Sequence, residues 1–184
     1  MIETTRTVLR NFQKDDLSVL HDYAKLVGVG EGAGWKHHES LDETTAMLET
    51  FIVNKRAYAI VSKKEQKVIG HISVHPDSEG GRDDTKELGF VLHPNYHNQG
   101  IMTEVIQAIL DNLFSQDISY VYACCFQNNS ASKRVIEKSG FLFEQEGEFF
   151  SQSLAQVFSS YEYVYTRKRW VEGDVQPLDD KKES

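Results

Sequence analysis

The alternation of apolar and polar positions is clearest in the middle of the chain. Between residues 87 and 92 the period is two, which places Leu88, Phe90 and Leu92 on one face of a predicted strand. Pro94 lacks the N–H that a sheet ladder needs and ends this strand. Beyond Gly100 the apolar residues recur at steps of three and four and form one stripe, made of Ile101, Met102, Val105, Ile106, Ile109, Leu110, Leu113 and Phe114. Residues 87–114 therefore predict a strand, a turn containing glycine, and a helix.

The same two periods outline the rest of the chain. Further strands are predicted at residues 7–12, 58–62, 68–75, 118–125, 142–146 and 161–167. Helices are predicted from Leu17 to Val27 after the capping pair Asp15-Asp16, from Leu41 to Val53, and between the N-cap Asn129 and the C′ residue Gly140. The glycines of residues 28–34 predict a flexible loop, and residues 77–85 predict an exposed turn.

Length and composition restrict the class of protein. A chain of 184 residues suits one domain with a sizeable core, and 40% apolar residues is ordinary for a soluble globular protein. The net charge of −8 disfavours a nucleic-acid partner and would suit a cationic amine. We expect one domain over residues 1–170, followed by a polar and mobile tail over residues 171–184.

The cysteines and the N-terminus indicate a reduced compartment. Cys124 and Cys125 are the only cysteines, and neighbours on a strand point to opposite faces, so an internal disulfide is not expected. No metal-ligand spacing is present. The sequence shows neither an apolar signal region nor a stretch long enough to span a membrane, which predicts a cytoplasmic protein.

The turn before Ile101 has a possible chemical use. The first turn of a helix leaves backbone N–H groups without partners and carries partial positive charge. A loop that approaches closely at Gly100 could therefore hold a diphosphate. The alternative is an ordinary strand-to-helix turn.

Three motifs resemble the GNAT superfamily of N-acetyltransferases. Residues 97–104, His-Asn-Gln-Gly-Ile-Met-Thr-Glu, are similar to its acetyl-CoA loop, Gln/Arg-x-x-Gly-x-Gly/Ala, although His97 and Met102 depart from that pattern. Residues 129–141 match Asn-x-x-Ser…Glu-Lys-x-Gly-Phe, and residues 34–38 match Gly-Trp-x-x-His. The RimJ/RimL-type branch is the most similar.

The resemblance implies a fold and a set of ligand contacts. The fold would be a single α/β domain with a mixed, mostly antiparallel sheet, one splayed pair of strands, and helices on both faces. Acetyl-CoA would be the cosubstrate, without a metal. The residues expected to contact it are Val91, Leu92, His97, Asn98, Gln99, Gly100, Ile101, Met102, Thr103, Asn129 and Ser132. Trp35, His38 and His71 are expected on the acceptor side.

The catalytic groups remain open between alternatives. Many family members use a tyrosine to protonate the departing thiolate, and Ile136 stands at that place. Ser132 is then the candidate donor, and helix capping is its alternative role. For the base, Glu87 is favoured over His38 and then His71.

These motifs predict direct acetyl transfer from acetyl-CoA to a primary amine, either a protein N-terminus or a small molecule. The alternative is a non-catalytic acyl-CoA-binding module, since the expected tyrosine is absent at Ile136. A nucleotide-binding protein is disfavoured because the Lys and Ser/Thr of a Walker loop are missing. A homodimer is possible.

Overall fold

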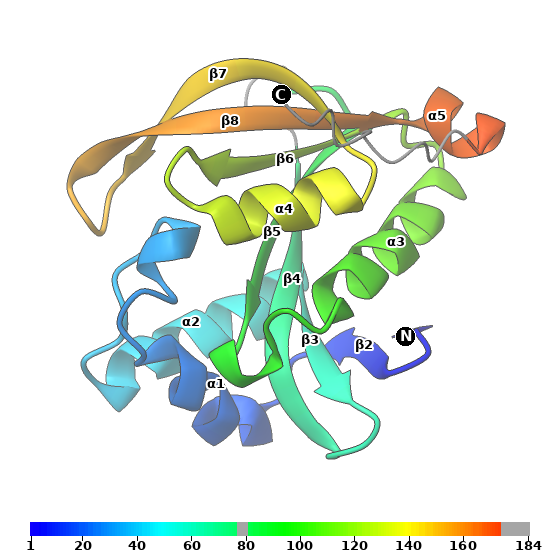
Figure 1. Ribbon diagram of the computed structural model, residues 1–184. Coiled ribbons are helices and arrows are strands. Elements are labelled where there is room, and N and C mark those ends of the chain that lie inside the picture. Colours follow the sequence, from blue (N-terminus) through cyan, green and yellow to red (C-terminus); the bar gives the residue numbers. More distant parts are fainter. Residues whose placement is uncertain (77–80, 174–184) are drawn as a thin grey trace.

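The computed structural model describes residues 1–76 and 81–173, which form one eight-stranded sheet with helices around it (Figure 1). The strands are β1 (Ile2–Glu3), β2 (Thr7–Asn11), β3 (Ala57–Ser62), β4 (Lys67–Pro76), β5 (Thr85–Leu92), β6 (Tyr120–Phe126), β7 (Leu142–Ser151) and β8 (Gln156–Thr166). The α-helices are α1 (Leu17–Ala24), α2 (Leu41–Asn54), α3 (Ile101–Phe114), α4 (Ser130–Lys138) and α5 (Arg167–Glu172). Short 3₁₀ turns occur at η1 (Lys14–Asp16), η2 (Glu31–Ala33) and η3 (Pro94–Tyr96).

The sheet runs in the order β1-β2-β3-β4-β5-β6-β8-β7 and is antiparallel except between β5 and β6. This parallel pair is in register only from Thr85 opposite Tyr120 to Leu88 opposite Ala123. Beyond that point β5 continues against β4 as far as Leu92, and β6 continues against β8 as far as Phe126. The predicted mixed sheet with a splayed pair of strands is confirmed.

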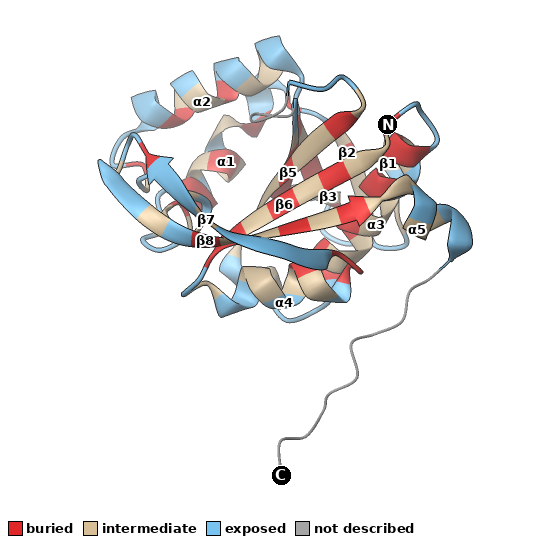
Figure 2. Cartoon of the chain, turned by 90° about the horizontal axis from the view of Figure 1, so that it is seen from above, coloured by how far each residue is buried: buried red, intermediate tan, exposed pale blue. Residues whose placement is uncertain are grey.

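Helices cover both faces of the sheet (Figure 2). The apolar stripe of α3 is buried along its whole length, as predicted, and it packs with Ile136 of α4 against one face. On the other face, Leu20 and Tyr23 of α1 and Leu48 of α2 pack against β3 and β4. A parallel pair of strands needs a crossover connection, and α3 provides it between β5 and β6.

The starts of helices α1 and α2 differ in their capping. Ser40 and Glu43 form a capping box at the start of α2. The prediction that Asp15-Asp16 caps α1 is wrong in detail, because no side chain caps that helix. The Asp16 carboxylate instead accepts two hydrogen bonds from the Arg10 guanidinium, at 2.7 and 2.8 Å. Helix α1 ends at Ala24, so Val27 lies outside it and is 78% exposed.

Other differences concern loops and the last hairpin. The glycine-rich residues 28–34 are not simply a loop, since they contain η2. Thr85 is a buried residue of β5 and not part of an exposed turn, and residues 77–80 of that predicted turn lie outside the described residues. Strand β7 is twice as long as predicted, and β8 begins five residues earlier than predicted and ends one residue earlier.

The chain end adds one further element. Helix α5 reaches Glu172, past the predicted domain end at residue 170, and residues 174–184 of the predicted tail lie outside the described residues. No helix within residues 1–76 and 81–173 has the length and apolar character needed to cross a bilayer.

Candidate active site

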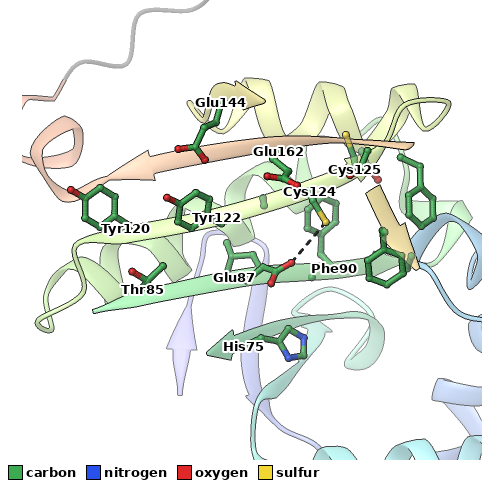
Figure 3. Close-up of a pocket in the computed structure, with 18 of the residues that line it drawn as sticks. His75, Thr85, Glu87, Phe90, Tyr120, Tyr122, Cys124, Cys125, Glu144 and Glu162 are labelled. Carbon is green, nitrogen blue, oxygen red and sulfur yellow. Dashed lines mark hydrogen bonds between the residues drawn. The ribbon is translucent and has the colours of Figure 1, made fainter. Parts of the chain in front are cut away.

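A cavity of about 1270 Å³ lies where β5 and β6 separate (Figure 3). Thr85, Glu87 and Gly89 line it from one face of β5, while Leu88 and Phe90 line it from the other. Because neighbouring residues of a strand point to opposite faces, a cavity lined by both sets passes through the sheet. It also reaches Ser132 in the first turn of α4. The gap between the strands is therefore continuous with the N-terminal end of α4.

Glu87 occupies the middle of this cavity. It lies opposite His75 of β4 and in register with Tyr122 of β6. The Cys124 thiol donates to Glu87 Oε1 at 3.8 Å, the contact drawn as a dashed line in Figure 3. Glu87 is thus a carboxylate inside the cavity, with an imidazole and a thiol beside it.

The two cysteines are unsuited to nucleophilic catalysis. Burial, reinforced by the Glu87 carboxylate, raises the pKa of Cys124 to about 12. Burial also raises the pKa of Cys125 to about 11. The thiolate is the nucleophilic form of cysteine, so neither thiol is reactive near neutral pH. This agrees with transfer that avoids a covalent enzyme intermediate.

His75 is a cavity residue that sequence reasoning did not select. Desolvation lowers the pKa of His75, the Glu87 carboxylate opposes this effect, and Arg56 adds to it. An imidazole with a lowered pKa is neutral at pH 7 and can accept a proton. The available signal was strand parity, because His75 lies on the same face of β4 as His71.

The far wall of the cavity combines carboxylates with aromatic rings. Glu162 of β8 and Glu144 and Glu148 of β7 line this wall. The aromatic lining residues are Phe90, Tyr120, Tyr122, Phe126 and Phe149. Sequence analysis missed Glu148 and Phe149 because it ended the strand at residue 146.

The N-terminus of α3 fits a diphosphate. Gly100 is its N-cap in a left-handed conformation with φ 71°, and no side chain caps the helix. The N–H groups of its first turn are therefore directed at the surface without a capping acceptor. Arg6 lies beside this turn, where Nη1 donates to the Gln99 carbonyl at 2.7 Å and Nε pairs with Glu104. Sequence analysis gave no signal for Arg6, since 93 residues separate it from Gln99.

His97 connects the loop to β5. Its Nε2 lies 2.8 Å from the Leu92 carbonyl oxygen, so the ring nitrogen and that carbonyl already have partners. Val91 is buried in the core on the α1 and α2 face. Residues 89–92 of β5 pair with β4 but not with β6. One edge of this stretch therefore faces the gap between the strands.

Asn129 and Ser132 have separate positions at the start of α4. Asn129 Oδ1 accepts from the Ser132 N–H at 3.1 Å, so Asn129 is the cap, as predicted, and the alternative that the Ser132 side chain caps the helix is wrong. Asn129 Nδ2 donates to the Gly32 carbonyl at 3.0 Å and ties η2 to α4. Ile136, at the place of the family tyrosine, is fully buried in the core.

Trp35, His38 and His71 do not line the cavity. The His38 ring lies 5.1 Å from the Trp35 ring, and its Nδ1 lies 2.9 Å from Thr44 Oγ1. His71 is 5% exposed and its Nδ1 lies 3.0 Å from the Tyr23 hydroxyl. Burial lowers the pKa of His71 to about 4. In the structure these residues pack around α1 and α2.

No cluster of three or more His, Cys, Asp or Glu within the described part of the chain could hold a metal ion.

The chain is similar in sequence to a known protein family and to known proteins. A family profile described as "Acetyltransferase (GNAT) domain" matches residues 6–142. The chain is 26% identical over 173 residues to the uncharacterized N-acetyltransferase YnaD of Bacillus subtilis (strain 168), covering 92% of this chain and 98% of that protein.

Solved structures show the same fold. A GNAT-family acetyltransferase from Bacillus anthracis superposes with a TM-score of 0.79 at 24% identity, covering 91% of this chain and 98% of that one. Spermidine N-acetyltransferase from Vibrio cholerae, in complex with CoA and spermine, has a TM-score of 0.74 at 16% identity, covering 91% of this chain and 99% of that one. At these identities the likeness concerns the fold alone.

Proposed function

The chain belongs to the acetyltransferase (GNAT) family and is an acyltransferase, and from that premise we propose direct acetyl transfer from acetyl-CoA to a primary amine. The observation that carries this proposal is the cavity through the sheet. It connects the N-terminal end of α4 on one face with Glu87 on the other. A thioester entering from the helix side would meet an amine bound on the Glu87 side.

The acetyl-CoA contacts are proposed from the loop and the splayed strand. The N–H groups of residues 98–103 would hold the diphosphate, with Gly100 allowing close approach and the helix dipole favouring negative charge. The edge of β5 near Val91 and Leu92, which does not pair with β6, would lie along the pantetheine arm, with the Leu92 carbonyl already bonded to His97. His97 would act indirectly, because its ring holds the loop against Leu92.

Proton transfer is assigned to Glu87 and Ser132. Glu87 would take a proton from the acceptor ammonium, directly or through water, and His75 lies opposite to accept it in turn. Among the described residues no group pairs with the Ser132 hydroxyl, which leaves it available to donate to the departing thiolate. His38 and His71 are the lower-ranked bases, since neither lines the cavity.

The acceptor and the setting are proposed more broadly. A small amine and a protein N-terminus are both primary amines, and the spermidine N-acetyltransferase of the same fold supports the former. Trp35 and His38 would shape the acceptor side through α2 and η2. Membership of the RimJ/RimL-type branch, a cytoplasmic location and a homodimer complete the proposal.

The deciding experiment combines binding with turnover. Acetyl-CoA at about a hundred times its dissociation constant should stabilise the fold by roughly 2.7 kcal/mol, and ATP should have much less effect. Thiol release, corrected for hydrolysis, is then measured with a panel of primary amines. Binding without amine-dependent release would favour the non-catalytic acyl-CoA-binding module. The absence of any thermal shift at millimolar acetyl-CoA would exclude both functions.

A further inference from the structure

We propose that the acceptor is a small amine with a second positive charge, which binds to Glu162 and its neighbours Glu144 and Glu148. This inference rests on the proposed acetyl transfer and names the substrate class of the same cavity. The reacting amine would face Glu87, and the second ammonium would face the wall formed by β7 and β8.

The carboxylates of that wall have no cationic partner in residues 1–76 and 81–173. Among the residues that the structure describes, Glu144, Glu148 and Glu162 form no ion pair, although all three line the cavity. Glu162 accepts a hydrogen bond from Gln145 Nε2 at 2.7 Å. A partly enclosed carboxylate without a counter-charge favours binding of a cation.

Gly147 leaves the space that the Glu162 carboxylate occupies. A Cβ on Gly147 would collide with Glu162 Oε1, so the absence of a side chain lets the carboxylate lie against β7. The Gln145 hydrogen bond and this close approach fix the position of the carboxylate before a ligand binds.

The Arg56 guanidinium places positive charge at the opposite side of the cavity, whereas the charge of Arg82 is offset by a carboxylate partner. Arg56 lines the cavity near His75 and forms no ion pair within the described part of the chain. Arg82 is paired with Asp84 at 2.9 Å and lies over the Tyr120 ring. A second cationic group on the acceptor is therefore repelled from the β4 side and attracted to the β7–β8 side.

The strand register separates the two binding points. Glu87 is on β5, Glu162 is on β8 opposite Cys124, and β6 runs between them (Figure 3). Across the sheet the two residues are two strand spacings apart, about 9.6 Å, and they are also offset by two positions along β6, because Glu87 is in register with Tyr122 and Glu162 with Cys124. The rings of Tyr122 and Phe149 border the same space and offer faces to an alkylammonium chain. The geometry selects a chain with charges at both ends over a short or singly charged amine.

The size of the acceptor is limited by a connection above the cavity. Ser151 Oγ donates to the Gly34 carbonyl at 2.8 Å, and the Lys36 N–H donates to Ser153 Oγ at 3.1 Å. The Phe149 ring packs against Gly34, where a Cβ would approach it to 2.7 Å. The β7–β8 turn is thus tied to the segment around η2, which borders this end of the cavity.

The test uses three acceptors of matched length: heptylamine, 1,7-diaminoheptane and 7-aminoheptanoate. We expect kcat/KM for the diamine to exceed that for the monoamine about tenfold or more, and the amino acid to be the poorest. Glu162→Gln should reduce the diamine-to-monoamine ratio at least about threefold, and Glu148→Gln should reduce it less. Glu146→Gln, on the same strand but outside the cavity, is the matched control and should leave the ratio unchanged.

The outcomes separate the inference from the proposed function. Equal kcat/KM for heptylamine and the diamine would overturn the inference while leaving acetyl transfer intact. Preference for 7-aminoheptanoate would overturn it in favour of Arg56 as the recognition group. Failure of these three amines while another primary amine or a peptide N-terminus is acetylated would overturn the inference alone, and failure of every primary amine would overturn the proposed function itself. An unchanged ratio in folded Glu162→Gln would remove Glu162 from substrate recognition.

Discussion

The two sides of the sheet opening differ in how they are built. On the proposed cofactor side, the loop 97–103 and the start of α3 offer main-chain N–H groups from one continuous segment. On the acceptor side, the cavity is lined by side chains from β4 to β8, including His75, Glu87 and Glu162. A main-chain site tolerates side-chain changes as long as the backbone keeps its shape. A side-chain site depends on individual residues, so its chemistry can change while the fold remains.

The largest expected effect tests the acceptor side. Glu87→Gln keeps the size of the side chain and removes the proposed base. A positioned general base contributes about 10²- to 10⁴-fold, so kcat should fall by that factor with acetyl-CoA affinity nearly unchanged. Steady-state kinetics across pH and CoA titration measure the two effects, with His75→Gln as the neighbouring comparison. A fall in CoA affinity equal to the fall in kcat would contradict the assignment of Glu87 to the acceptor side alone.

The second prediction tests whether His71 belongs to the protein core or to the acceptor site. Burial lowers its pKa from 6.5 to about 4, so the unfolded chain binds this proton below pH 6.5 while the folded chain does not. The free energy of unfolding should therefore decrease by about 3 kcal/mol as pH falls from 6.5 to 4. His71→Gln should lose this part of the pH dependence in denaturant titrations and keep much of its activity. Loss of turnover in folded His71→Gln would return His71 to the acceptor site.

The third prediction tests the main-chain character of the cofactor side. Gly100 has φ 71°, so any side chain there is strained by about 1–3 kcal/mol. Gly100→Val should raise the dissociation constant for CoA about tenfold or more, because it adds bulk where the diphosphate approaches. Gly100→Ala carries the same backbone strain with little bulk and is the control. Isothermal titration with CoA and circular dichroism decide it. Unchanged affinity in Gly100→Val would place the phosphates elsewhere.

The smallest expected effect distinguishes two neighbours at the start of α4. Asn129 caps the helix, so Asn129→Ala should cost about 0.5–2 kcal/mol of stability. Ser132→Ala should leave stability unchanged and lower kcat about tenfold, because Ser132 lines the cavity and the cap uses its backbone N–H and not its hydroxyl. Thermal scans and kinetics on the two variants measure this. Full activity in Ser132→Ala would assign thiolate protonation to solvent.

The helix and turn of the proposed cofactor side were predictable because their information is local. The stripe of α3, the bounds 101–114 and the left-handed Gly100 all follow from one segment of the sequence. The cap at Asn129 and the positive φ of Gly140 follow in the same way.

The acceptor side was only partly predictable because strand pairing brings distant residues together. Glu87 was identified on its strand from the sequence. That Glu87 and Glu162 line the same cavity depends on the strand order β5-β6-β8. The extension of β7 to Ser151 was missed because most of that edge strand is exposed and shows no apolar alternation. Trp35, His38 and His71 were expected at the acceptor, yet Tyr23 and Thr44 bind the two histidines within the α1 and α2 face.

The short register between β5 and β6 also has a mechanical consequence. The sheet divides into five strands on one side and three on the other, joined by four residue pairs from Thr85 and Tyr120 to Leu88 and Ala123. Helix α3 crosses the boundary between the two parts and packs against both of them, so it limits their movement relative to each other. A ligand inserted between β5 and β6 would contact both parts of the sheet. It would therefore reduce their relative motion at the boundary where only four residue pairs join them.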